Sequence, residues 1–355
     1  MTLMNQAALS YIEKTVAPLR EQAHCMLKNV LLMSNVTIER LQQAKHNIAQ
    51  HGRVALHFHP DHIDSRGLTV AQGLLKDGVY KTQFETHISN GQLAPELGGI
   101  RDHWENQFFG HAYAGIQHRP KYGALDFGLN PYGPAPRFGS CYLLSHCALL
   151  KNCSFSYMDS HRLLPERGTL ACFEVVLAAL LTESFERQSA LGVNVFDPDA
   201  LIAYLCSFTD IAQRFTHTGF ANLDHYIEAQ IHDDVSLEED ICALVVDPCY
   251  QNTPMDETLQ ALANQYDITL YYHQGYQMDA AHTPNNFRGA CMPALAKQVA
   301  RQGVMTPFNL GVATLRCTEE LASWQQRDMQ QQQLQQLKLL WHVLVKFGVN
   351  TTPLS

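Results

Sequence analysis

The spacing of apolar residues changes twice along this chain, and those changes constrain its fold more than any other feature. From Leu9 to Gln50, apolar residues recur every three to four positions, which is typical of amphipathic helices. Short segments with strand-like alternation follow, and helix-like spacing returns after residue 255. The pattern predicts an α+β protein in three parts: a helical segment at 1–52, a sheet-containing core at 53–254 and a mainly helical extension at 255–355.

Capping and turn residues set several expected boundaries. Ser34 or Asn35 is expected to cap a helix that begins near Thr37, and Gly52 to end that helix in the left-handed conformation. Further helices are expected at 68–75, 169–189 and 199–215, after Met255, near 292–302 and at 319–347. Strands are expected at 53–59, 79–86, 121–127, 140–150, 153–158, 225–232, 241–246 and 268–272. Long loops are expected between 91 and 139.

Composition narrows the functional classes. Hydrophobic residues make up 46% of the chain and charged residues 17%, which favours a globular core over disorder. With a formal net charge of -9, the surface of the chain cannot neutralise the many phosphates of a nucleic acid. A macromolecular partner is therefore expected to be protein rather than nucleic acid. No apolar stretch long enough for a bilayer and no secretory signal is apparent. Ten cysteines without a CxxC motif favour a reducing cytoplasm, and a protein delivered into another cell without a cleavable signal would look the same.

A histidine-rich motif follows the first expected strand. His57, His59, Asp61 and His62 spell HxHxDH, which resembles the metal-binding motif of the metallo-β-lactamase superfamily and would support metal-dependent hydrolysis. That fold places several strands before the motif, whereas this chain places helices there. An amidohydrolase barrel needs eight strand and helix repeats that this sequence does not offer. The structural alternative is that these histidines are hydrogen-bonded at the end of a strand.

A second combination of residues leads to different chemistry. On a strand, His57 and His59 point to the same side, so two imidazoles face one cleft. Far downstream, Glu228 lies on another expected strand, followed by a polar turn at Asp233 and Asp234 and a further apolar strand. An imidazole pair and a strand carboxylate can therefore meet if the two strands share a sheet.

These segments resemble the ADP-ribosyltransferase superfamily. Its members carry His or Arg on a first core strand, Tyr or Ser-Thr-Ser on a second, and Glu on a late strand; here LHFHP, RFGSCY and YIEAQ take those places. The resemblance covers roughly residues 53–250. It implies a split mixed or antiparallel sheet, wrapped here by the terminal helices, and NAD as substrate with no metal. If the Ser-type pattern applies, the catalytic carboxylate is expected where Gln230 stands, so Glu228 and Gln230 both remain candidates.

The resemblance also implies a role for each site residue. Glu228 would stabilise the oxocarbenium-like transition state that forms when nicotinamide leaves ribose. The implied NAD-binding residues are His59 and His57 on the ribose, Arg137 on the pyrophosphate, Ser140 on the carboxamide, and Tyr142 or Tyr122 stacked on nicotinamide. Each has a structural alternative: an exposed strand carboxylate, a salt-bridge partner, a turn residue or a core aromatic side chain.

The phrases HFHPD, YKTQFETHISNG, RPKYGALDF, PRFGSCYLLS and YIEAQIHDDVSLEEDI are also similar to an uncharacterised bacterial family of unknown function. That similarity supplies no activity. The leading hypothesis is therefore ADP-ribosyl transfer from NAD to a macromolecular acceptor, or NAD hydrolysis. The alternatives are a metal-dependent hydrolase and a non-catalytic binding module.

Two further clusters of polar or metal-binding residues are candidate sites. Gln83, Glu85 and Asn90 form a polar group that either contacts substrate or closes its own loop. Three evenly spaced cysteines could suggest zinc, but consecutive strands would scatter them over different faces: Cys141, Cys147 and Cys153.

Overall fold

A single mixed sheet forms the centre of the molecule. The computed structural model describes residues 3–86, 96–320 and 327–349. Across the sheet the strands are β10 (Thr269–Tyr272), β9 (Ile241–Val246), β3 (Cys141–Ser145), β1 (Arg53–Phe58), β2 (Lys121–Asp126), β8 (Ile227–Ile231), β4 (Cys153–Tyr157) and β5 (Arg167–Thr169). All neighbours are antiparallel except β9 and β10, which are parallel. The expected α+β class is confirmed, and the sheet is continuous where a split sheet was expected.

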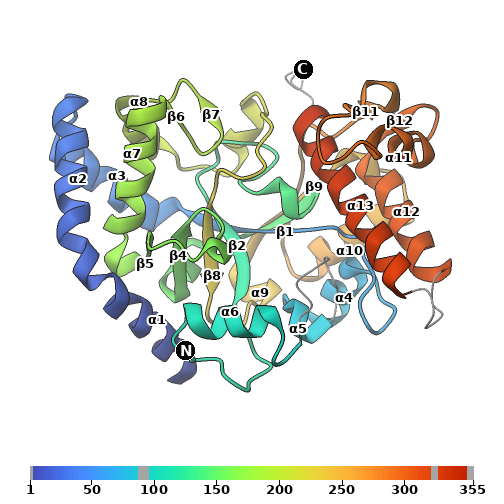
Figure 1. The fold of residues 1–355 in the computed structure, drawn as a ribbon, viewed down its shortest axis with the longest axis horizontal. Helices are drawn as coiled ribbons and strands as arrows, with labels where there is room; N and C mark the ends of the chain where they lie inside the picture. The colour runs from blue at the N-terminus through green and yellow to red at the C-terminus, as the bar shows by residue number, and fades with distance from the viewer. Residues whose placement is uncertain (1–2, 87–95, 321–326, 350–355) are drawn as a thin grey trace.

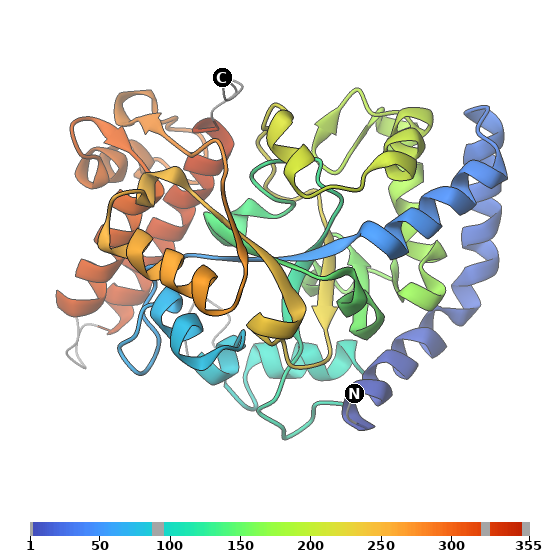
Figure 2. The ribbon, with the colours of Figure 1, turned by 180° about the vertical axis from the view of Figure 1, so that it is seen from behind.

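The N-terminal helices lie along one side of this sheet (Figures 1 and 2). They are α1 (Leu3–Val16), α2 (Arg20–Met33) and α3 (Ile38–His51), of which α2 packs on α7 (Glu174–Arg187) and α3 on α8 (Pro198–Ser207). The cap of α3 is Thr37, whose hydroxyl accepts a hydrogen bond from the Arg40 amide at 3.4 Å. The expected cap at Ser34 or Asn35 is therefore wrong, because those residues form the turn after α2.

Gly52 ends α3, but with a φ of -59° rather than in the left-handed conformation. Glycine is required there by space, because an added Cβ would lie 2.5 Å from the Ile48 carbonyl oxygen. The expectation of a helix end at this position is confirmed, and the reason given for it is wrong.

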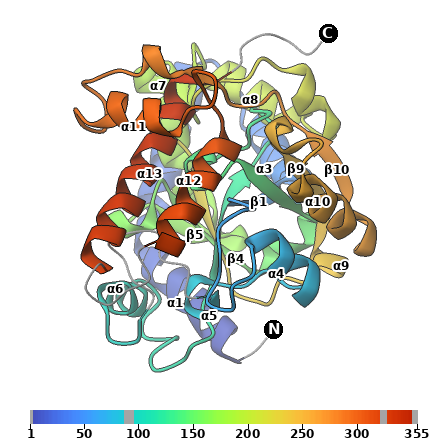
Figure 3. The same cartoon turned by 90° about the vertical axis from the view of Figure 1, so that its right-hand side faces the viewer.

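The C-terminal helices lie on the opposite side of the sheet (Figure 3). They are α11 (Met292–Val299), α12 (Pro307–Glu320) and α13 (Arg327–Phe347), accompanied by a small sheet of β11 (Met278–Asp279) and β12 (Val304–Met305). The helix α10 (Pro254–Gln265) packs instead on α4 (Val70–Asp77) and β10, and its apolar residues join the main core. Met292, Leu340 and Trp341 belong to a second apolar cluster beneath α11 to α13. The helix α12 was not predicted, and residues 321–326, within the helix expected at 319–347, lie outside the described residues.

Two segments differ from their expected strands. Residues 79–86 form only an isolated bridge at Val79 and then the short helix α5 (Gln83–Thr86), after α4 (Val70–Asp77). Glu85 stabilises that turn by accepting hydrogen bonds from the Thr82 amide and hydroxyl, at 2.8 and 2.9 Å. The strand expected at 140–150 ends at Ser145, and a 3-10 helix follows at Cys147–Asn152. A further helix, α6 (Ile100–Phe108), lies in the region expected to be loop.

The two faces of the sheet differ in polarity. On β8, Ile227, Ala229 and Ile231 point into the main apolar core. The alternate residues, Glu228 and Gln230, point to the other face, where Gln230 bonds hydroxyl groups of β4 and Glu228 accepts from the Ser160 hydroxyl beyond β4. This second face of the sheet carries the candidate site. None of the helices described in the structure is long and apolar enough to span a bilayer.

Candidate functional site

Strand register places His57 and Glu228 on the same face of the sheet. Glu228 pairs with Ala124 on β2, and Ala124 pairs with Ala55 on β1. His57 lies two residues beyond Ala55, so its side chain leaves the same face. β1 and β8 therefore belong to one sheet, with β2 between them; that this face grips a ligand stays a prediction.

The Glu228 carboxylate is buried and hydrogen-bonded. Its side chain Oε1 accepts hydrogen bonds from the Ser160 hydroxyl and, at 2.9 Å, from Gln230 Nε2. Burial raises the pKa of Glu228 to about 7, and the negative charge of Asp159 adds to this rise. A carboxyl group with a pKa near neutrality changes charge within the physiological range, which is typical of functional carboxyl groups.

A chain of hydrogen bonds leads across β8 and β4 to Glu228. Tyr113 lies 2.7 Å from Nδ1 of His232, whose Nε2 lies 2.8 Å from the Ser154 hydroxyl. That hydroxyl donates to Gln230 Oε1 at 2.6 Å. Since the Ser154 proton points to Gln230, His232 donates from Nε2 and accepts at Nδ1 from Tyr113. Every donor in the chain therefore points toward Glu228.

Gln230 lies within this chain, whereas Glu228 ends it. Gln230 is fully buried and uses its amide to join Ser154 to Glu228; which of the two takes a catalytic position stays a prediction. Sequence reasoning missed His232, Ser160 and Tyr113. The period-two row Glu228, Gln230, His232 on one strand was the signal available for His232.

His57 is held by the backbone instead of facing a ligand. Its Nε2 accepts a hydrogen bond from the Ala135 amide at 3.3 Å, so its Nδ1 donates to the Gly139 carbonyl oxygen at 3.1 Å. Burial lowers the pKa of His57 to about 3. With both ring nitrogens engaged, His57 fixes the 131–139 loop on the sheet, and it offers no nitrogen to NAD or to a metal.

The structure gives three other predicted NAD-binding residues different degrees of burial and different contacts. Tyr142 is fully buried, and its hydroxyl donates to the Pro131 carbonyl oxygen at 2.8 Å. Ser140 is also buried, at 1% exposure. Tyr122 is half-buried, donates to Glu105 at 3.0 Å and lies 5.9 Å from the Trp104 ring. Of these three, only Tyr122 keeps a partly accessible ring beside the polar face.

Arg137 forms a salt bridge with Asp224, and its guanidinium lies 5.1 Å from the centre of the Phe138 ring. Its side chain is 20% exposed. Its charge influences Tyr226, Lys338 and the ring of His342, which places it at the edge of the Glu228 face. Arg137 therefore already has an acidic partner, and its predicted contact with a pyrophosphate stays a prediction.

The turn after β1 gathers three metal-ligating side chains. One donor atom from each of His59, Asp61 and His62 lies within 4.8 Å of the others. The two imidazole rings stack with centroids 4.6 Å apart. Burial raises the pKa of Asp61 to about 7, lowers that of His62 to about 4 and lowers that of His59 well below its ordinary 6.5. Both rings are therefore neutral at pH 7, the state in which an imidazole nitrogen can bind a cation.

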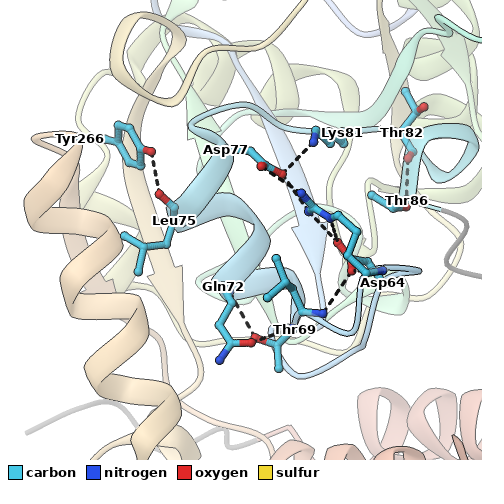
Figure 4. A network of polar contacts seen from close by, with 11 residues as sticks. Asp64, Thr69, Gln72, Leu75, Asp77, Lys81, Thr82, Thr86 and Tyr266 are labelled. Carbon is cyan, nitrogen blue, oxygen red and sulfur yellow. Dashed lines mark hydrogen bonds and ion pairs between the residues drawn. The ribbon is translucent and has the colours of Figure 1, made fainter.

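The segment that follows this turn is rigidly braced. The amide of Val70, the first residue of α4, donates to the His62 carbonyl oxygen at 2.8 Å. Arg66 binds both Asp64 and Asp77, and Lys81 binds Asp77 as well (Figure 4). These contacts fix the backbone on which the three donors stand.

The remaining predicted clusters are a polar group around Glu85 and three cysteines. Gln83 accepts from Arg101 and Glu85 closes its own turn, while Asn90 lies outside the described residues. Cys141 and Cys153 are buried free thiols. In the parts of the chain that the structure describes, no cysteine belongs to a group able to hold a metal ion.

Comparison with known proteins gives one result. A family model described as a protein of unknown function, DUF3626, matches residues 53–347. The match confirms the expected similarity to an uncharacterised family and does not extend to the ADP-ribosyltransferases. No curated protein matches the chain.

Proposed function

The chain belongs to the DUF3626 family, whose description names no activity, and from the geometry of the site we propose that it cleaves NAD between nicotinamide and ribose. ADP-ribose is transferred to a macromolecular acceptor or to water. Glu228 is the catalytic carboxylate. Its position at the acceptor end of a one-way hydrogen-bond chain is the observation that carries the proposal.

The reaction needs a fixed negative charge beside the sugar. As the glycosidic bond breaks, its electron pair leaves with neutral nicotinamide, and positive charge develops on ribose C1′ and the ring oxygen. An acceptor hydroxyl, amine or water then bonds to C1′ and releases its proton to solvent. The donors from Ser160 and Gln230 orient the Glu228 carboxylate, so little reorganisation is needed when that charge appears.

The surrounding residues supply contacts for the rest of the dinucleotide. Arg137 and Lys338 place two cations near the Asp159 and Glu228 edge, which suits a pyrophosphate. Tyr122 offers the half-buried ring for nicotinamide. His57 takes no part, since both of its ring nitrogens bind the backbone. The net charge of -9 favours protein over nucleic acid as the acceptor.

The test measures nicotinamide release from NAD by the full chain, with and without cell extract as a source of acceptors. Glu228→Gln is expected to reduce the rate at least 100-fold. The matched control Glu238→Gln makes the same change on an exposed residue of α9 (Leu237–Asp240) and is expected to leave the rate unchanged.

Because the active form of Glu228 is ionised, the rate is expected to rise with pH through about 7. No release by the wild-type chain in either condition, or equal release by Glu228→Gln, would contradict the proposal.

A further inference from the structure

We propose that His59, Asp61 and His62 form a binding site for one divalent transition-metal ion, which connects the end of β1 with the C-terminal helices. The proposal goes beyond the NAD chemistry above and departs from the expectation that no metal is bound. It also assigns His59 to a cation rather than to ribose. Three observations support it independently of Glu228.

The first observation is the grouping of donors. The chosen atoms of the three side chains lie within 4.8 Å of one another. Ligands of a tetrahedral ion, at bond lengths of about 2.0–2.2 Å, lie about 3.4 Å apart. Hydrogen bonds to α4 already fix the backbone of this turn. Small side-chain rotations therefore suffice to bring the three donor atoms onto one ion.

The second observation is the unsatisfied carboxylate. Asp61 is 6% exposed; its Oδ2 accepts from the Tyr250 hydroxyl at 3.0 Å, and its Oδ1 has no hydrogen-bond partner among the described residues. A buried acceptor without a partner is costly, and a bound cation would satisfy it. Gly311 of α12 leaves the room for this carboxylate, since a Cβ there would lie 1.6 Å from Asp61 Oδ2.

The third observation comes from α13. His342 is 3% exposed, and neither of its ring nitrogens has a hydrogen-bond partner among the described residues. It interacts electrostatically with His59, and its neighbour Trp341 packs edge-on against the His59 ring at 5.0 Å. His342 is thus a second buried imidazole without a hydrogen-bond partner among the described residues, on the helix that packs against His59.

The donor set indicates which ions fit. Two imidazole nitrogens and one carboxylate oxygen suit Zn²⁺, Fe²⁺ or Co²⁺, whereas Mg²⁺ and Ca²⁺ prefer oxygen ligands alone. β1 runs from the N-terminal helices toward α12 and α13, so an ion at its end lies between the sheet and the C-terminal helices (Figure 1). Bound metal is therefore expected to stabilise the contact between these two parts.

The experiment uses the full chain, freed of metal with a chelator and then titrated with zinc chloride alone. Competition with a chromophoric chelator gives the affinity, and elemental analysis after gel filtration gives the stoichiometry. One zinc ion per chain and a higher melting temperature are expected. Cobalt substitution is expected to give visible absorption of a low-coordinate nitrogen and oxygen site.

Four variants locate the site. Asp61→Asn keeps the shape of the side chain and an acceptor for Tyr250, and is expected to weaken zinc binding at least 10-fold, as are His59→Ala and His62→Ala. The matched control His46→Ala removes an exposed imidazole on α3 and is expected to leave the affinity unchanged.

Circular dichroism and melting of the metal-free variants separate lost binding from lost folding. If Asp61→Asn, with an unchanged spectrum, binds zinc as the wild type does, the site is wrong. Binding below a tenth of an ion per chain, or equal loss in His46→Ala, would also overturn it. Glu228→Gln is expected to bind zinc normally, so failure of this site and failure of the NAD proposal are distinguishable.

Discussion

Replacing Glu228 by glutamine is expected to stabilise the folded protein above pH 7 while removing the proposed cleavage of NAD. Glu228 is 6% exposed, and burial followed by the charge of Asp159 raises its pKa from the ordinary 4.5 to about 7. The folded state therefore holds the proton more tightly than the unfolded state does. Glutamine keeps the Oε1 atom that accepts from Ser160 and Gln230, but it carries no charge.

The sign and size follow from linkage between protonation and folding. Below pH 4.5 the carboxyl group is neutral in both states, so it imposes no penalty on folding. As pH rises from 4.5 to 7, only the unfolded state readily loses the proton, and stability falls. The difference between 4.5 and about 7 corresponds to about 3 kcal/mol, which is reached in full above pH 7.

The assay is urea unfolding of both proteins at pH 5, 6, 7 and 8, followed by tryptophan fluorescence and circular dichroism. The free energy of unfolding of Glu228→Gln is expected to exceed that of the wild type by an amount that grows to about 3 kcal/mol at pH 8. The control Glu238→Gln, on the surface, is expected to show no such growth. A gap that does not change with pH would refute the reasoning.

Two further substitutions test how the polar face is held. Arg214 and Asp126 form an ion pair at 2.7 Å, and both side chains are 2% exposed. Arg214→Met leaves the buried Asp126 charge unpaired and is expected to lower the free energy of unfolding by about 3–5 kcal/mol. Urea unfolding measures this change, and a loss below about 1 kcal/mol would contradict the prediction. Gly139→Ala places a Cβ 2.2 Å from the backbone of Phe58, so it is expected to displace the 131–139 loop and to lower the melting temperature. The comparison is Gly98→Ala, where the added Cβ meets open space and the positive φ is the source of strain. Equal melting temperatures of the two variants would count against the close contact at Gly139.

Local sequence patterns predicted much of the scaffold. The strand expected at 53–59 appears as β1, and the strand expected at 241–246 appears as β9 with the same bounds. The carboxylate strand at 225–232 contains β8, so Glu228 was placed on the correct element. These predictions held because apolar periodicity is a property of neighbouring residues and needs no distant partner.

The failures occurred where a distant or polar contact overrides the local pattern. Residues 79–86 look like a strand, yet Thr82 and Glu85 close a helical turn. The continuity of the sheet depends on β2 joining β1 to β8, which no local pattern reveals. The helix α12 was not predicted from the sequence. Its Gly311 approaches Asp61 closely, so this helix lies beside the cluster of His59, Asp61 and His62.

By itself, the sequence determined which chemical groups are present and which share a strand face, because side chains alternate along a strand whatever surrounds them: Glu228, Gln230 and His232 follow from that rule. The tertiary structure alone decided which of two nearby histidines is available. His57 meets the carbonyl and amide of a loop about eighty residues away in sequence, whereas His59 meets Asp61, His62 and the helix α13. Hydrogen-bond partners are set by packing between distant segments, so the role of an imidazole is fixed only once the chain has folded.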